Sequence, residues 1–253
     1  MENNEEINEN NNKGDNENRE NNQDKNKAIL LNNTKYKIEI AKDDFMDDEI
    51  VFKIILIGDS GVGKTSLSLR LTENLFEDFR KATIGFDIFN YTAKINDVLI
   101  KLQIWDTCGL EEFASCTPSL YKNANLAIVV YAINDSKSFT NLDKWINLVK
   151  DNASPNTLIF IVGNKSDLEN ERKVQKEEGE KFKEDNNYQF FTESSAKKNE
   201  FVNELFQQAI IQLYEQDKEQ KKGDIKKEDF ARRKDSKKLN RPKQLEKKKK
   251  NCC

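Results

Sequence analysis

Residues 58–65, GDSGVGKT, constrain the fold of this 253-residue chain more than any other stretch. They follow an apolar run at 50–57 and precede a helix-like run that begins at Lys64. Glycines let backbone N–H groups approach an anion, and the N-terminus of the following helix adds further free N–H groups. The spacing is typical of a phosphate-binding loop, in which Lys64 reaches the β- and γ-phosphates and the Thr65 hydroxyl holds Mg²⁺. A glycine-rich turn without a ligand is the alternative.

The charge of the chain is segregated into regions. Residues 1–49 carry 14 acidic and 7 basic side chains, whereas residues 218–253 carry 16 basic and 6 acidic ones. The first 33 residues include 13 asparagines and have too few apolar side chains to offset the entropy of folding. We therefore expect a disordered Asn/Glu-rich extension at 1–45, one folded domain at 46–217 and a basic tail at 218–253.

The N-terminal region leaves two further hypotheses open. Residues 35–41 are able to add a short edge strand. Met46 is also a reasonable start for the folded domain, so the first 45 residues are alternatively a gene-model extension. No signal peptide is apparent, and the longest strongly apolar run, 126–133, is too short to cross a bilayer. The absence of histidine excludes His-based catalysis, and the four cysteines show neither disulfide nor zinc-site spacing, so we expect a reduced, cytosolic location.

Strand and helix patterns alternate through the middle of the chain. Strand patterns lie at 51–57, 85–95, 98–105, 126–132, 158–162 and 189–192, and the turn Asn96-Asp97 joins the second and third of them into a hairpin. Helical periodicity is found at 64–73, 137–150, 174–183 and 200–215, and it fades into charge beyond Glu215. These patterns predict an α/β fold with a hairpin at the edge of the sheet.

Two further motifs lie where predicted strands end. Asp106 and Gly109 belong to DTCG, where a carboxylate holds Mg²⁺ through water and a glycine N–H meets a γ-phosphate. In NKSD, at 164–167, Asp167 can accept hydrogen bonds from N1–H and the N2 amine of guanine, which adenine does not offer. Asn164 and Lys165 would brace the base. Either motif alone also fits an ordinary polar loop.

The motif SAK, at 195–197, completes the series, because the Ala196 N–H can donate to guanine O6. In this order the motifs resemble those of the Ras-superfamily small GTPases, and within them the Rab family, over about residues 50–215 and at the C-terminus. The Rab-like stretches are IGFDIF at 84–89, KLQIWDT at 101–107, LYKNAN at 120–125, SFTNLDKWI at 138–146 and the final Cys252-Cys253. The resemblance implies a P-loop NTPase fold: a mostly parallel six-stranded sheet with one antiparallel edge hairpin, and helices on both faces. It also implies GTP/GDP binding, Mg²⁺ and two nucleotide-sensing switches.

The resemblance also assigns roles to individual residues. The implied nucleotide-binding residues are Asp59, Ser60, Gly61, Val62, Gly63, Lys64, Thr65, Ser66, Phe76, Thr83, Gly109, Asn164, Lys165, Asp167, Ser195, Ala196 and Lys197. The implied Mg²⁺ ligands are Thr65, Thr83 and Asp106, and Lys64, Thr83 and Gly109 are implied to act in GTP hydrolysis. Effectors would contact Ile84, Phe86, Phe89, Trp105 and Leu120, although hairpin core is the alternative for the aromatic residues.

The chain departs from the family pattern at Leu110, where Rab proteins usually have the glutamine that orients the attacking water. Losing one such interaction typically costs about 2–4 kcal/mol, so we predict weak intrinsic hydrolysis and a GTP-biased state. An activating protein that supplies its own glutamine would tolerate Leu110. A GTP-locked effector-binding module is the alternative function. Another P-loop NTPase, an ATPase or nucleotide kinase, is a third, which Asp167 opposes.

Other departures lie near the expected switches and effector surface. Cys108 replaces an alanine, and a small residue in a switch is the expected role, with redox sensitivity as the alternative. Glu112 replaces an arginine and Leu120 a tyrosine, which puts familiar effectors in doubt.

The C-terminus resembles the Rab double-cysteine end, where both thiols, here Cys252 and Cys253, are geranylgeranylated. Two lipid chains with a polybasic patch anchor a protein stably, and an unmodified tail is the alternative. A nucleic-acid-binding arm is disfavoured because no aromatic residues are interleaved with the lysines. By resemblance, the partners are Rab escort protein, geranylgeranyl transferase, GDP dissociation inhibitor, an exchange factor, a GTPase-activating protein and effectors. We expect a monomer at the cytosolic face of an intracellular membrane, acting in vesicle and protein transport.

Overall fold

The structure is a computed structural model that describes residues 36–41, 49–79, 82–109 and 118–239, with side chains as far as residue 223. Its contacts divide the chain into two units, Met1–Ile211 and Gln212–Cys253. The sequence predictions for Leu110, Glu112, Cys252 and Cys253 lie outside the described residues.

The first unit is organised around one seven-stranded sheet in the order β1-β3-β4-β2-β5-β6-β7. Strands β4, β2, β5, β6 and β7 run parallel, while β3 is antiparallel to β4 and β1. Their bounds are Ile38–Ile40 for β1, Ile50–Ile57 for β2, Phe86–Ile95 for β3, Val98–Thr107 for β4, Leu126–Ala132 for β5, Leu158–Asn164 for β6 and Phe190–Ser194 for β7. Every residue of β5 is buried, as its continuous apolar sequence predicts for a central parallel strand.

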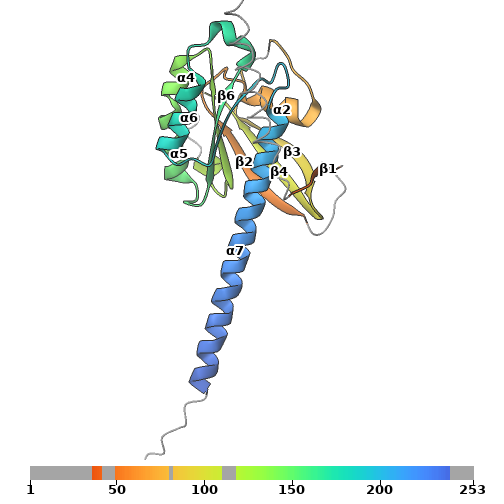
Figure 1. The fold of residues 1–253 in the computed structure, drawn as a ribbon, viewed down its shortest axis with the longest axis vertical. Helices are drawn as coiled ribbons and strands as arrows, with labels where there is room; N and C mark the ends of the chain where they lie inside the picture. The colour runs from red at the N-terminus through yellow and green to blue at the C-terminus, as the bar shows by residue number, and fades with distance from the viewer. Residues whose placement is uncertain (1–35, 42–48, 80–81, 110–117, 240–253) are drawn as a thin grey trace, which may run out of the picture. The chain divides into compact units, whose positions relative to one another are not determined.

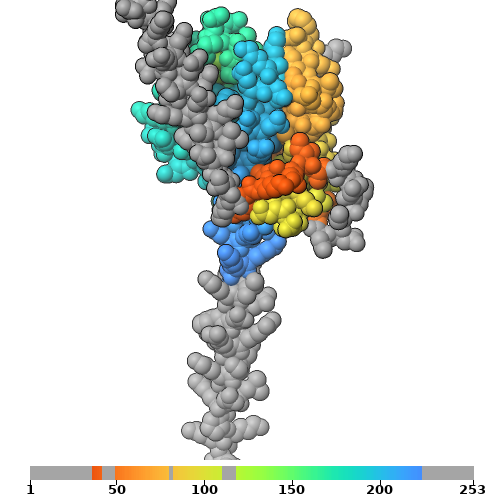
Figure 2. Space-filling view, turned by 45° about the vertical axis from the view of Figure 1, so that its right-hand side comes forward, coloured from red at the N-terminus to blue at the C-terminus, as the bar shows by residue number. Residues whose placement is uncertain are grey.

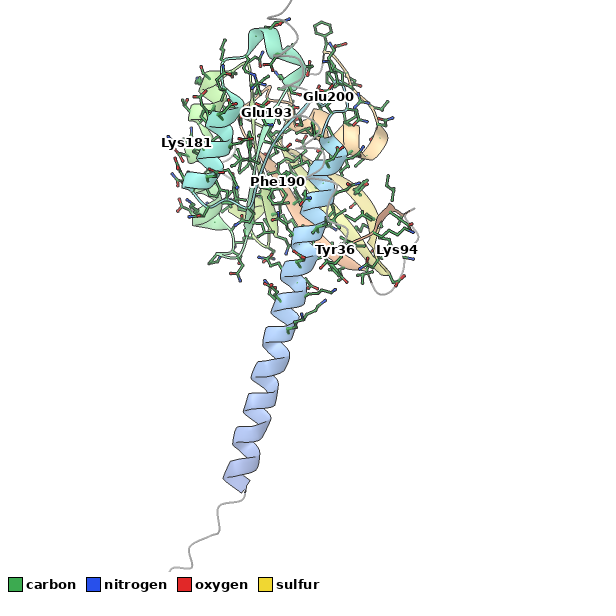
Figure 3. The ribbon with its side chains drawn as sticks, viewed as in Figure 1. Tyr36, Lys94, Lys181, Phe190, Glu193 and Glu200 are labelled. Carbon is green, nitrogen blue, oxygen red and sulfur yellow. The ribbon has the colours of Figure 1, made fainter. Side chains whose placement is uncertain are left out.

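The predicted α/β architecture with a mostly parallel sheet is confirmed, and the sheet has seven strands instead of the six that the resemblance implies. The short strand β1 pairs with β3, with Ile38 opposite Ile95 and Ile40 opposite Ala93, and it forms that edge of the sheet (Figure 2). Tyr36 and Lys94 mark the same edge in Figure 3. The edge strand expected at 35–41 is therefore present. Pairing with β1 satisfies backbone groups that β3 would otherwise leave open.

Helices cover both faces of the sheet. Helices α4 (Ser136–Thr140), α5 (Leu142–Asn152) and α6 (Lys176–Asp185) lie on one side, and α2 (Lys64–Glu73) follows β2 and packs on β3 and β4 (Figure 1). Short 3₁₀ helices lie at Pro118–Leu120 and Ser166–Glu171. The single helix predicted over 137–150 is instead two, because Asn141 ends α4 and precedes α5.

The last helix, α7, spans Val202–Leu239, so the prediction that helical structure ends near Glu215 is wrong. Glutamate, glutamine and lysine have high helix propensity, and an ion pair at i,i+4, between Asp217 and Lys221 (2.7 Å), adds to it. The loss of apolar periodicity therefore does not mark the end of the helix. Across the described part of the chain, no helix combines the length and the apolar character needed to span a membrane.

Candidate nucleotide-binding site

The predicted phosphate loop joins β2 to α2, and its backbone requires glycine. Gly58, Gly61 and Gly63 have positive φ values of 139°, 78° and 98°. A Cβ at Gly63 would lie 2.2 Å from Asn164 Nδ2, and one at Gly58 would lie 2.1 Å from the Val130 carbonyl oxygen. The sequence at these two positions is thus fixed by close packing as well as by conformation.

Lys64 extends back along this loop. Its Nζ donates to the carbonyl oxygens of Gly58 (2.8 Å) and Asp59 (2.9 Å), and its side chain is buried. Burial lowers the pKa of Lys64 to about 8, although nearby Asp106 and Asp59 favour the charged form. A cation held in this way faces the centre of the loop, where an anion would bind.

The three predicted Mg²⁺ ligands lie together. Thr65 Oγ1 donates to Asp106 Oδ2 (2.5 Å) and lies 2.8 Å from Thr83 Oγ1. These residues come from three segments, the start of α2, the loop before β3 and the end of β4, and Asp106 is fully buried. Hydroxyl and carboxylate oxygens are the ligands that Mg²⁺ prefers, so this donor set fits the ion.

Gly109 packs directly against the phosphate loop. A Cβ there would lie 2.3 Å from the Ser60 nitrogen and 2.4 Å from the Asp59 carbonyl carbon. Only glycine allows this approach. The neighbouring Cys108 is buried.

The predicted base-binding residues connect the ends of β6 and β7 to the phosphate loop. Asn164 Nδ2 donates to the Val62 carbonyl (2.9 Å), and Asn164 Oδ1 accepts from the Ala196 N–H (3.3 Å). Ser195 Oγ donates to Asp167 Oδ1 (2.6 Å), which orients the carboxylate expected to recognise guanine. The Ala196 N–H, expected to donate to guanine O6, is directed toward Asn164 in this structure.

An ion pair that was not predicted joins the residue after the 3₁₀ helix Ser166–Glu171 to β7. Arg172 donates to both oxygens of Glu193 at 2.6 and 2.8 Å, and the two side chains are each only 11% exposed. Glu193 lies on β7 (Figure 3). The hydrogen bonds that Arg172 donates to Glu193 and to Glu169 raise the pKa of its guanidinium. Arg172 and Glu193 are 21 residues apart, so no local pattern reveals the pair.

These segments enclose a cavity of about 390 Å³. It is lined by all of the predicted nucleotide-binding residues except Asp59, Val62 and Ser195. Each of these three is hydrogen-bonded to a residue that does line the cavity. Five lining residues were not predicted: Glu77, Asp78, Ala82, Thr107 and Leu168. Each lies within two residues of a predicted one, so the neighbours of Phe76, Thr83, Gly109 and Asp167 were the available signal. Lys197 and Asp78 form an ion pair at 2.7 Å, and Lys197 Nζ lies 6.0 Å from the Phe76 ring centroid.

The predicted effector-facing residues separate onto different surfaces. Phe86 stacks on Trp105 with centroids 5.1 Å apart, and Ile88 pairs with Trp105 across β3 and β4. Ile84, Phe86 and Ile88 are 94%, 44% and 46% exposed. Ile88 therefore belongs to the same exposed apolar surface, although it was not among the predicted effector-facing residues. Strand alternation, which was the available signal, places Phe89 on the opposite face of β3. Leu120 is buried.

Known proteins share this sequence pattern. The Ras family profile matches residues 53–215. Ras-related protein Rab-13 of Bos taurus is 45% identical over 156 residues, which are 62% of this chain and 76% of that protein. Rab-13 of Rattus norvegicus is 44% identical with the same coverage. Ras-related protein Rab5A of Oryza sativa subsp. japonica is 40% identical over 161 residues, 64% of this chain and 79% of its own length. The chain therefore belongs to the Ras family and is a small GTPase of the Rab type.

Proposed function

We propose that this protein is a GTP-binding switch that regulates vesicle and membrane trafficking by cycling between GDP- and GTP-bound states. One observation carries the proposal. Residues expected to bind phosphate, Mg²⁺ and guanine come from five separate segments of the sequence, and together they form and support one cavity.

Thr65, Thr83 and Asp106 would hold Mg²⁺, which, when bound, neutralises phosphate charge. Thr83 and Gly109 would contact the γ-phosphate, and its loss would release the two segments that carry them. Lys64 would bind the β- and γ-phosphates, and Asp167 would select guanine. The lining of the cavity supports these assignments because Lys64, Thr83, Gly109 and Asp167 all face the same space.

Intrinsic hydrolysis is proposed to be slow because Leu110 has no polar group with which to orient water. The basic region 218–253 and lipids on Cys252 and Cys253 would anchor the folded domain, 46–217, to the cytosolic face of a membrane. The escort, prenylating, exchange, activating and extracting proteins of the Rab cycle would be its partners.

The test uses the full chain and a fluorescent GDP analogue. Competition by GDP but not by ADP is expected, because adenine leaves the Asp167 carboxylate unpaired. Equal competition by ADP would overturn the guanine assignment and favour another P-loop NTPase.

Single-turnover GTP hydrolysis is then compared between the wild type and Leu110→Gln. We expect the variant to be at least about tenfold faster. Equal rates would show that another group positions the water. A wild type that hydrolyses no GTP even with a Rab-activating protein would instead favour the GTP-locked effector-binding module.

A further inference from the structure

Asp59 is the one acidic residue of the phosphate loop, and its carboxylate is bound outside the cavity lining. Its Oδ1 accepts from Trp145 Nε1 and its Oδ2 from Asn141 Nδ2, each at 2.7 Å. These donors lie 82 and 86 residues further along the chain. Each carboxylate oxygen therefore has its own donor from the junction of α4 and α5.

The two donors belong to the packed core. Trp145 is 1% exposed and lies in a cluster with Leu142, Ile146 and Val149 from the same helix. The backbone N–H of Asn141 bonds to the Lys137 carbonyl at 3.0 Å, which fixes it at the end of α4. Because the indole N–H can only donate and is buried, it would be costly to leave without an acceptor.

The peptide that follows the Asp59 side chain is held as well. The Asp59 carbonyl accepts from Lys64 Nζ, and Gly109 packs against the Asp59–Ser60 peptide. Ser60 is the next residue and lines the cavity. The direction of the N–H groups in an anion-binding loop depends on such peptide orientations. The start of the loop is thus held at the Asp59 carbonyl by Lys64, at the following peptide by Gly109, and at the Asp59 carboxylate by its two donors.

We propose that Asp59 is a positioning residue, which sets the phosphate loop through Trp145 and Asn141 and thereby tightens the binding of nucleotide phosphates. This inference rests on the proposed nucleotide-binding function. The carboxylate of Asp59 also lies beside an anion site and therefore repels phosphate. The proposal requires that the positioning of the loop favours phosphate binding by more than this repulsion opposes it. The two effects have opposite signs, so they are separable by experiment.

The test measures dissociation of the fluorescent GDP analogue from the full chain. If Asp59 positions the loop, Asp59→Ala releases the analogue at least about tenfold faster, as expected for loss of hydrogen bonds to a charged group. Asp59→Asn stays within about threefold of the wild type, since its amide can accept from Trp145 and donate to a turned Asn141 side chain. If the charge dominates, both variants release the analogue more slowly, which overturns the proposal.

A second readout distinguishes positioning from general loss of stability. The affinity ratio of GDP to GMP reports binding of the β-phosphate, and it is expected to fall in Asp59→Ala and, to a lesser extent, in Trp145→Phe. Ser138→Ala is the matched control, because it removes buried hydrogen bonds of α4, to the Ala132 N–H and the Asp135 carbonyl, and does not contact Asp59. Its GDP-to-GMP ratio is expected to equal that of the wild type.

The outcomes separate the two proposals. A wild type that does not bind the analogue overturns the proposed function. A wild type that binds it, with Asp59→Ala and Ser138→Ala showing equal ratios, overturns only the role of Asp59. In a Trp105→Phe background, the indole N–H resonance of Trp145 shows directly whether each variant retains the hydrogen bond. A resonance that does not shift in Asp59→Ala also contradicts the proposal.

Discussion

The phosphate end and the base end of the cavity are built from different parts of the polypeptide. At the phosphate end, Ser60, Gly61 and Gly63 of the phosphate loop line the cavity, and buried contacts of the neighbouring loop residues hold them in place. At the base end, side chains on the segments after β6 and β7 line the cavity, and ion pairs connect these segments to other parts of the fold. Arg172 pairs with Glu193 on β7, where both side chains are nearly buried, whereas Lys197 forms an exposed pair with Asp78, which follows α2.

This difference has a consequence for the effect of mutations. At Gly58, Gly63 and Gly109 the backbone geometry cannot accommodate an added side-chain atom, because neighbouring atoms already occupy the space. A side-chain surface fails only when a particular pair loses a partner, and the loss depends on how buried that pair is. The four experiments below test this contrast, beginning with the largest expected effect.

The largest effect is expected for Gly63→Ala. The new methyl group would lie 2.2 Å from Asn164 Nδ2, which donates to Val62, and alanine is strained at a φ of 98°. Left-handed strain and a lost buried hydrogen bond together should release GDP about 1,000-fold faster. Gly85→Ala is the control, because it has a φ of 78° with nothing within 4 Å of the added Cβ. Similar nucleotide release by the two variants would contradict the role of close packing.

At the base end, Arg172→Met should lower the free energy of unfolding by about 3 kcal/mol, because it leaves the nearly buried Glu193 unpaired. The control is Lys176→Met, which breaks an exposed pair with Glu180 (3.8 Å) on α6 and should change stability by less than about 0.5 kcal/mol. Urea unfolding measures both. If the two losses are equal, burial is not what makes the Arg172 pair important.

A pH experiment addresses the buried cation of the phosphate end. Burial lowers the pKa of Lys64 from an ordinary value of 10.5 to about 8. Between these values the unfolded chain binds more protons, so the stability of the nucleotide-free protein should rise with pH. From pH 7 to pH 9.5 the contribution of Lys64 is about 2 kcal/mol. Lys64→Met should lack this part of the pH dependence, as urea unfolding at several pH values would measure. If the variant and the wild type show the same dependence of stability on pH, Lys64 is not desolvated in the folded protein.

The sequence predicted lining residues at both ends of the cavity but not the contacts that hold them, for a physical reason. Gly58, Gly63 and Lys64 lie within seven residues, so their roles depend on a local backbone path that a motif describes. Asn164, Asp167 and Ala196 were also found by motif. The contacts that hold these motifs in place, such as Arg172 with Glu193 and Asp59 with Trp145, join distant segments and carry no local pattern.

The remaining errors in the fold have similar causes. The split at Asn141 depends on a cap that the apolar pattern of 137–150 does not reveal. The edge strand anticipated at 35–41 was only an open possibility, because its formation depends on pairing with the distant β3. The extension of α7 to Leu239 agrees with the high helix propensity of its sequence, which an apolar pattern does not report.

The smallest effect is expected at the rim of the base end, for Asp78→Asn. Lys197 and Asp78 meet at 2.7 Å, but their side chains are 53% and 60% exposed, so solvent screens the pair. The hydrogen bond to Asp78 raises the pKa of Lys197 above its ordinary value. GDP release should accelerate by only about twofold at low salt, and the difference from the wild type should vanish at high ionic strength, where surface pairs are screened. Stopped-flow release at two salt concentrations measures this. A large, salt-independent acceleration would instead show that Asp78 contributes to the site through its packing beside Phe76, and the base end would then depend on close contacts as the phosphate end does.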